Sequence, residues 1–210
     1  RTLTGLSMSI LIGVLAAGVS AVMALILGIC AATLGKKVDS AISFAIDTVM
    51  GIPHILLLIL ISYAMGKGLK GVIAGVALTH WTSLARLIRG EVMQLRESEY
   101  IQIAGKLGLG KWEIAKKHIV PHVLPQFIVG LVLLFPHAIL HESSITFLGF
   151  GLSTEQPAIG VILSESMRYL IMGKWWLAVF PGMMLVLTVV LFEKGGTAIR
   201  QLLDPGSVHK

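Results

Sequence analysis

The sequence predicts an all-α fold, a polytopic bundle of helices that spans a membrane. Hydrophobic residues make up 55% of the 210 residues and charged residues only 13%, and the mean hydropathy is +0.87. A soluble domain carries roughly 25% charged residues. The apolar residues also fall in runs of about 20 or more, the length that a helix needs to cross roughly 30 Å of hydrocarbon. We therefore expect residues 1–210 to form a single transmembrane domain.

Five apolar runs along the chain are long enough to cross the bilayer. They are Leu6–Leu34, Ala41–Met65, Leu69–Leu87, Ile119–His141 and Trp175–Phe192. Gly and Pro interrupt these runs, so the helices are not expected to be rigid rods. Cys30 is the only cysteine of the sequence, which excludes an intramolecular disulfide or a cysteine-based metal cluster.

Basic residues between the runs predict the orientation. Residues 86–118 contain seven of the 17 Lys and Arg residues, which places this segment in the cytoplasm by the positive-inside rule. Alternation then puts residues 142–174 outside and the C-terminus in the cytoplasm. The same rule puts Arg1 outside, so we expect these five spans to belong to a six-span protein whose first span is missing here. The net charge of +6 is explained by Lys and Arg in the segments between the apolar runs, where they set the orientation of the protein in the membrane. Nucleic acid is therefore not expected as a partner.

The external loop, residues 142–174, contains a predicted amphipathic helix at 158–170. Its apolar stripe is expected to lie along the outer membrane surface, and consists of Ile159, Ile162, Leu163, Met167 and Leu170.

The cytoplasmic segment 91–118 predicts a hairpin of two short helices. The first covers Glu97–Leu107, with Ser98 as its N-cap and with Ile101, Ala104 and Leu107 on one face. Gly108 and Gly110 break it, and a second helix covers Trp112–Val120, which Pro121 should end. A charged, amphipathic hairpin on this side of the membrane is typical of a docking element. The alternative is a hairpin that rests on the inner leaflet, anchored by Trp112.

The run "EYIQIAGKLGLGKWEIAKKHIVP" resembles the signature loop of permease subunits of bacterial ABC importers. Gln102, Ile103 and Ala104 stand where that loop usually has Glu-Ala-Ala, Gly108 is the signature glycine, and Ile119–Pro121 closes the loop. The pieces "RTLTGLSMSILIG", "FLGFGL" and "LLDP" are similar to the second permease of the dipeptide, oligopeptide and nickel family, and "ALTHW" and "PHAILHESSITFLG" resemble its nickel branch.

This resemblance implies a type I ABC importer transmembrane domain in the cell inner membrane. Its expected partners are a second homologous permease, two cytoplasmic ATPase subunits, an extracytoplasmic solute-binding protein and membrane lipid. The residues that would couple to an ATPase are Glu99, Gln102, Ala104, Gly108, Leu109 and Gly110. The chain has no Gly-rich loop ending in Lys-Ser or Lys-Thr, so ATP and Mg²⁺ are expected to be used by the partner subunits, and this chain is not expected to be an enzyme or to hold a cofactor.

Ionisable residues inside spans are costly and tend to mark a transport pathway. His54 and His80 fall near the middle of their runs, while His137 and His141 are four residues apart on one helical face near the outer mouth. The latter two could share a divalent metal, with Glu142 as an added oxygen ligand. We therefore expect nickel or a metal chelate as cargo. The alternatives are dipeptides or oligopeptides, with the histidines as helix-packing residues, and a gated channel.

Overall fold

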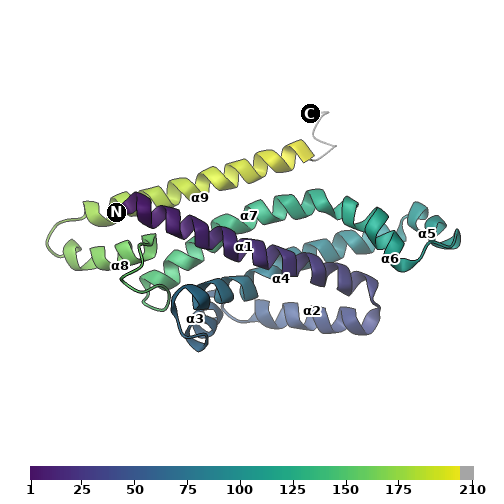
Figure 1. The fold of residues 1–210 in the computed structure, drawn as a ribbon, viewed down its shortest axis with the longest axis horizontal. Helices are drawn as coiled ribbons and strands as arrows, with labels where there is room; N and C mark the ends of the chain where they lie inside the picture. Colours follow the sequence, from purple (N-terminus) through teal and green to yellow (C-terminus); the bar gives the residue numbers. More distant parts are fainter. Residues whose placement is uncertain (204–210) are drawn as a thin grey trace.

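In the computed structural model, residues 1–203 are described, apart from the side chain of Lys111, and they form an elongated bundle of helices (Figure 1). The α-helices are α1 (Thr2–Thr33), α2 (Lys36–Gly51), α3 (His54–Ala64), α4 (Gly68–Glu97), α5 (Glu99–Lys106), α6 (Lys111–Ile114), α7 (Val120–Phe147), α8 (Ile159–Leu170) and α9 (Trp176–Leu203), and a π-helical turn, Ala115–Ile119, joins α6 to α7. The described residues contain no strand, so the all-α class is confirmed. The second half of the "LLDP" motif lies outside them.

Within residues 1–203, four helices are long and apolar enough to cross a membrane. They are α1, α4, α9 and the continuous helix Trp112–Phe147. The predicted span Ala41–Met65 is not one continuous helix, because α2 and α3 meet at an angle of 100°. Ile52 between them is extended, with φ −92° and ψ 136°, as expected for a residue before a proline. The pair counts as a fifth span only if its two halves are taken together.

The centre of the bundle is the contact of α1 with α4 and α7. The face of α1 that is turned inward consists almost entirely of Gly, Ala and Ser, which lets the backbones approach closely. A Cβ on Gly28 would lie 2.9 Å from the carbonyl oxygen of Ala85. On the same face of α1, nearer its middle, the Ser20 hydroxyl donates a hydrogen bond to the Ala77 carbonyl of α4 at 3.2 Å. Small residues thus hold the spans α1 and α4 together.

Two ion pairs join α2 to α4. Arg89 binds Asp39 with both arms of its guanidinium, and Arg86 binds Asp47 at 2.6 Å. Only Ile46 of α2 is buried, and Ile42 and Ala45 are partly buried against the core, so the ion pairs add to a small apolar contact. The next helix, α3, packs differently, because Gly71 of α4 lies directly against the backbone of α3.

The helix before Pro121 does not end there, which corrects the predicted boundary. The helix Trp112–Phe147 runs through this proline without a break. The π-helical turn Ala115–Ile119, which includes the residue four before Pro121, explains the difference, since local π geometry relieves the clash and the missing N–H that proline brings to an α-helix.

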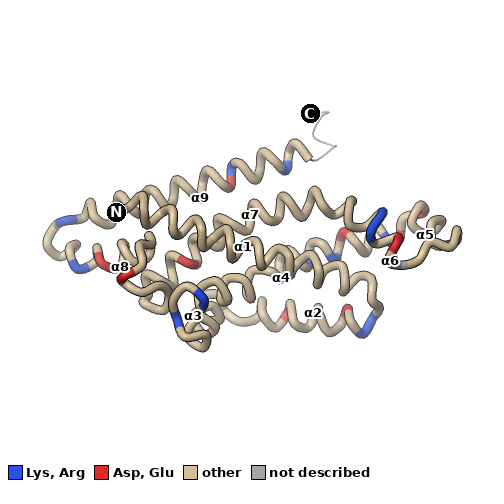
Figure 2. Tube along the Cα trace, viewed as in Figure 1, with Lys and Arg blue, Asp and Glu red and all other residues tan. Residues whose placement is uncertain are grey.

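The two predicted loops lie at opposite ends of the molecule. Figure 1 shows α5 and α6 at one end, and the start of α1 together with α8 at the other. Figure 2 shows that the long helix α1 has no Lys, Arg, Asp or Glu along its length, while the loops at both ends carry charge.

The predicted amphipathic helix at 158–170 corresponds to α8, and its place along the outer membrane surface stays a prediction. Burial changes along its apolar stripe: Ile159 is fully buried, but Met167 and Leu170 are 48% and 36% exposed. The reason is tight packing on α7, where a Cβ on Gly160 would lie 2.5 Å from the carbonyl oxygen of Ser143. The buried face is therefore set by Gly160 and Ser166 as well as by the large apolar residues.

Candidate functional site

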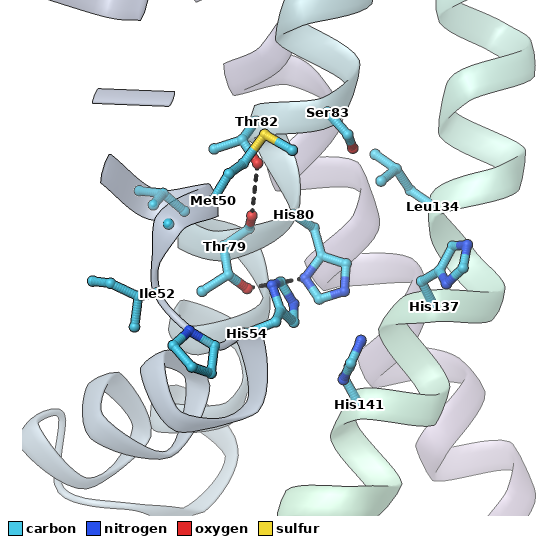
Figure 3. A pocket seen from close by; sticks show the side chains of 13 residues that line it. Met50, Ile52, His54, Thr79, His80, Thr82, Ser83, Leu134, His137 and His141 are labelled. Atoms are coloured by element: carbon cyan, nitrogen blue, oxygen red, sulfur yellow. Dashed lines mark hydrogen bonds between the residues drawn. The ribbon is translucent and has the colours of Figure 1, made fainter. Parts of the chain in front are cut away.

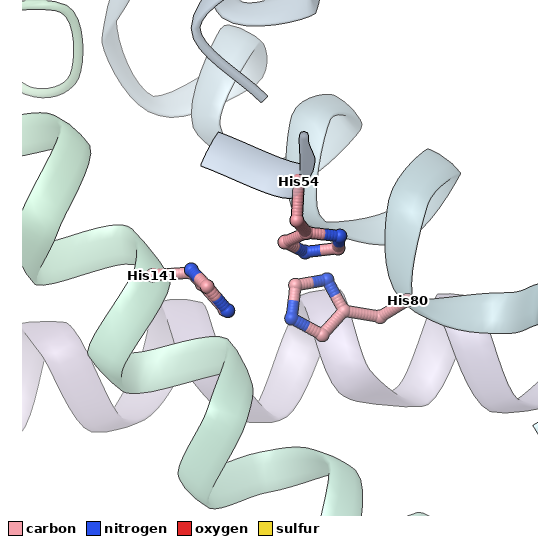
Figure 4. Close-up of side chains that lie close together, drawn as sticks. All are labelled: His54, His80 and His141. Atoms are coloured by element: carbon pink, nitrogen blue, oxygen red, sulfur yellow. The ribbon is translucent and has the colours of Figure 1, made fainter. Parts of the chain in front are cut away.

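Three histidines from three different helices meet beside the break between α2 and α3 (Figure 4). The ring centroid of His54 lies 4.6 Å from that of His80 and 4.6 Å from that of His141, and the centroids of His80 and His141 are 5.0 Å apart. Each ring offers a nitrogen, and these three nitrogens all lie within 4.8 Å of one another. We call these three residues the histidine cluster.

The local structure explains how each ring reaches this point. His54 is the first residue of α3, so the break at Pro53 turns it toward the bundle. His80 lies in the middle of α4 and is buried, and His141 lies on α7 and is half-buried. Because α3 crosses the direction of α2, the cluster exists only if the chain bends at Pro53.

Hydrogen bonds orient the ring of His80. Its Nδ1 lies 3.0 Å from the carbonyl oxygen of Val76 and 3.0 Å from the hydroxyl of Thr79. A carbonyl can only accept, so the proton is on Nδ1 and the lone pair is on Nε2. The Nε2 atoms of His80 and His54 are buried and have no hydrogen-bond partner in the part of the chain that the structure describes.

The cluster lies at the wall of an open pocket of about 580 Å³ (Figure 3). The other lining residues are Val49, Met50, Gly51, Ile52 and Pro53 at the break, Thr79, Thr82 and Ser83 of α4, and Leu134 and His137 of α7. Among these described lining residues, histidine is the only ionisable type. The pocket is therefore mainly apolar, with hydroxyls and imidazoles as its polar groups.

The histidines are not divided into two stations, as the sequence interpretation had placed them. His141 joins His54 and His80, while His137 lines the same pocket but is exposed and stands outside the cluster. The spacing of His137 and His141 does put both on one face of α7. The bend at Pro53 brings His54 close to α7. A prediction that treats each span as one helix does not include this bend.

Glu142 lies elsewhere, and the idea that it adds an oxygen ligand to the histidines is wrong. Its side chain is fully buried and accepts hydrogen bonds from Thr146 at 3.0 Å and from Ser143 at 3.2 Å. Thr146 in turn accepts a hydrogen bond from the backbone N–H of Leu152. Glu142 thus ties α7 to the loop that follows it.

The end that carries α5 and α6 exposes large apolar side chains. Tyr100, Ile103, Leu107 and Trp112 are 48%, 54%, 79% and 82% exposed. Gly108, between the two helices, has φ +91°, a conformation that side chains rarely adopt, and a Cβ there would meet no atom within 4 Å. This hairpin therefore presents an apolar surface around a turn that depends on glycine.

The remaining candidate coupling residues differ in their surroundings. Glu99 and Gly110 are exposed, Leu109 is half-buried, and exposed Gln102 donates to the Glu97 carbonyl at 3.1 Å.

Two details of the predicted helix Glu97–Leu107 are wrong. Its face with Ile101 and Ala104 is buried within this chain, Ala104 being 7% exposed, and the contact of Ala104 with an ATPase stays a prediction. Leu107 lies at the helix end, where it points to solvent and not along the buried face of Ile101. Ser98 occupies the N-cap position, but its hydroxyl donates to the Leu95 carbonyl and does not cap the helix.

Sequence reasoning missed the supporting residues of the pocket. The hydroxyl of Thr79 contacts Nδ1 of His80 and helps to orient its ring. Thr82 and Ser83 add hydroxyl groups to the wall of the pocket. The polar run "THWTS" inside an otherwise apolar span was a signal that could have identified them.

Comparison with known proteins identifies the family. Residues 24–207 match the family described as "Binding-protein-dependent transport system inner membrane component". The chain belongs to this family. It is therefore a multi-pass membrane protein, in agreement with its apolar helices.

The relatives of this family member include permeases named for peptides. The chain is 32% identical over 205 residues to the dipeptide transport system permease protein DppC of Bacillus subtilis (strain 168), which covers 98% of this chain and 64% of that protein. It is 30% identical over 205 residues to the probable D,D-dipeptide transport system permease protein DdpC of Escherichia coli (strain K12), which covers 98% of this chain and 68% of that protein. The chain thus spans about two thirds of the length of these relatives.

Solved structures share the fold. The inward-facing MetNI methionine ABC transporter contains a chain with a TM-score of 0.76 and 17% identity, covering 96% of this chain and 95% of that chain. A chain of an amino acid ABC transporter crystallised with histidines has a TM-score of 0.70 and 18% identity, covering 95% of this chain and 92% of that chain. The likeness confirms the predicted fold of an ABC importer transmembrane domain.

Proposed function

We propose that this chain is the membrane-spanning permease subunit of an ATP-driven importer and that its cargo is a dipeptide or oligopeptide. The peptide assignment is supported by the names of the relatives, which are 30–32% identical. Nickel, the cargo expected from the sequence, has no support from the names of these relatives. The histidine cluster is the observation that keeps a metal chelate as the second candidate.

One continuous helix carries this proposal. The segment Trp112–Phe147 begins in the exposed hairpin and reaches the pocket at His137 and His141. At 1.5 Å per residue, its 36 residues extend for about 54 Å. Because this helix is continuous, a displacement of the hairpin also moves the wall of the pocket. An ATPase subunit bound at the hairpin can therefore open and close the pocket.

The exposed surfaces leave room for the other partners. An apolar patch at the hairpin, made of Tyr100, Ile103, Leu107 and Trp112, suits the groove of a cytoplasmic ATPase. Helix α9 is mostly exposed and apolar, as is appropriate for lipid or for a second permease. In this proposal the separate ATPase subunits hydrolyse ATP. An extracytoplasmic binding protein docks on α8 and the turn that precedes it. In this arrangement the C-terminus is cytoplasmic.

Reconstitution in liposomes tests the function. The complete permease pair with its ATPase subunits and binding protein should take up a labelled dipeptide only when ATP and Mg²⁺ are supplied. Uptake of labelled nickel by the same liposomes, without dipeptide uptake, would replace the peptide assignment by the metal one. Uptake of either solute without ATP would contradict the importer and favour a channel.

A further inference from the structure

We propose that His54, His80 and His141 together bind one divalent transition-metal ion, of the class of Ni²⁺, Co²⁺ and Zn²⁺, with the remaining coordination positions turned toward the pocket. This binding site goes beyond the proposed function, because a peptide importer can exist with or without it. The proposal can therefore fail while ATP-driven peptide uptake stands.

The nitrogen atoms are close to the spacing that an ion requires. Zn–N bonds of about 2.0–2.1 Å place neighbouring ligands of a tetrahedral ion about 3.3 Å apart. The three candidate nitrogens already lie within 4.8 Å of one another. They belong to three separate helices, so small rotations of the rings are enough to bring them onto one ion. Imidazole is a ligand that this class of ions prefers.

The hydrogen bonds of His80 are those of a metal ligand. Its Nδ1–H donates to the carbonyl of Val76, which leaves the lone pair of Nε2 free for an ion. Ligating histidines commonly make such a bond through their second nitrogen, which fixes the ring. The Nε2 atoms of His54 and His80 are buried and unpartnered among the described residues, although buried polar atoms nearly always find a partner. An ion would supply the partner for both.

The charge balance indicates that the ion keeps a coordination position open toward the pocket, where an anion can bind. Three neutral imidazoles leave the full charge of the ion in place, and the described pocket lining includes no carboxylate. A buried charge is costly unless an opposite charge accompanies it. An anion in the pocket is therefore expected to complete the coordination, and the neighbouring hydroxyls of Thr82 and Ser83 can contact it.

The alternative is that the rings only pack against one another. The His54–His80 and His80–His141 contacts have the edge-on geometry of ordinary aromatic pairs. Such packing explains the ring positions, but it leaves the two buried Nε2 atoms without a partner. The test must therefore measure binding of a metal as such.

The experiment uses the full permease complex in detergent, purified without a polyhistidine tag. Titration with NiCl2 and with CoCl2 should show one site per copy of this chain. Replacing a ligand should weaken binding at least as much as loss of a supporting contact, about 10- to 100-fold. This loss is expected for His54→Ala and for His141→Ala. His122→Ala is the matched control, because this exposed histidine lies on the same helix as His141 and outside the pocket.

Two further measurements keep the result clear if buried His80 is needed for folding. His80→Gln preserves much of the side-chain volume and should also lose the metal. In the unaltered complex, bound Co²⁺ should give visible absorption bands that shift when azide is added, because an open position accepts an anion. Nickel affinity that is unchanged in His54→Ala and His141→Ala, or that falls equally in His122→Ala, would overturn the site. Bands that do not respond to azide would overturn its open face.

Discussion

The hairpin of α5 and α6 and the histidine cluster differ in how the chain builds them. The hairpin is one continuous segment, and its features follow from neighbours in the sequence, such as Gly108 between two short amphipathic helices. The cluster joins residues 54, 80 and 141, and it depends on a bend of 100°. A docking element can therefore be recognised locally, whereas the pocket is a property of the packed bundle. Variants should affect the two regions separately, except through the helix Trp112–Phe147 that connects them.

Gly108→Leu should have the largest effect. Its φ of +91° would be imposed on a residue with a branched side chain, at a cost of about 1–2 kcal/mol. This corresponds to about a tenfold shift of the hairpin away from its docking geometry. ATP-driven uptake should therefore fall by about tenfold or more in reconstituted liposomes, while the amount of inserted protein and metal binding at the cluster stay unchanged.

Gly110→Leu is the matched control for that variant. Gly110 is also exposed, and a Cβ added there would meet no atom within 4 Å, but its φ is outside the positive range. It should retain most of the uptake. Normal uptake by Gly108→Leu with all subunits present would remove the coupling role from this hairpin.

Sequence reasoning succeeded where hydrophobicity and local breakers decide the structure. It identified the long helices α1, α4 and α9, because each has an apolar run long enough to cross a membrane. It failed at two prolines in opposite directions. Pro53 separates two helices after the extended residue Ile52, whereas Pro121 follows a π-helical turn and the helix continues. A hydropathy average over about 19 residues does not distinguish these cases.

The candidate site was predictable only in part for the same reason. Each histidine in an apolar run was a reasonable choice, since such residues are costly in a membrane. Which of them meet depends on α3 crossing toward α7, and the spacing of His137 and His141 alone gave no sign that His141 meets His54 and His80. Glu142 shows the same limit, because its partners Ser143 and Thr146 are neighbours whose role becomes visible only in the folded chain.

Two glycines of α4 test how strictly packing sets the pocket. A Cβ on Gly71 would lie 2.6 Å from the backbone oxygen of Ser62 in α3. Gly71→Ala should therefore push the two helices apart and destabilise the protein by about 1–3 kcal/mol. Because His54 lies on α3 and His80 on α4, metal affinity should fall as well. Thermal unfolding in detergent and NiCl2 titration measure the two effects.

Gly90→Ala in the same helix provides the contrast. No atom lies within 4 Å of a Cβ at this position. Alanine is the better helix former by about 1 kcal/mol, so this variant should be at least as stable as the original protein. Equal destabilisation by Gly71→Ala and Gly90→Ala would mean that the close approach of α3 and α4 does not hold the pocket.

The smallest expected effect concerns the two ion pairs that attach α2 to α4. The side chains of Arg89 and Asp39 are 27% and 26% exposed, whereas those of Arg86 and Asp47 are 51% and 69% exposed. Exposed pairs contribute about 0.2–1 kcal/mol, and two-armed arginine contacts are the stronger kind. Double-mutant cycles with Arg89→Ala and Asp39→Ala should therefore give a coupling free energy near the top of that range, and the other pair one near the bottom. Because α2 leads directly into the bend beside His54, Arg89→Ala and Asp39→Ala should also lower nickel affinity slightly. The hairpin of α5 and α6 lies at the far end of the molecule, so coupling to the ATPase should not change. A larger coupling for Arg86 and Asp47 would show that exposure does not rank these contacts, and that α2 is held to the bundle mainly at its end next to the pocket.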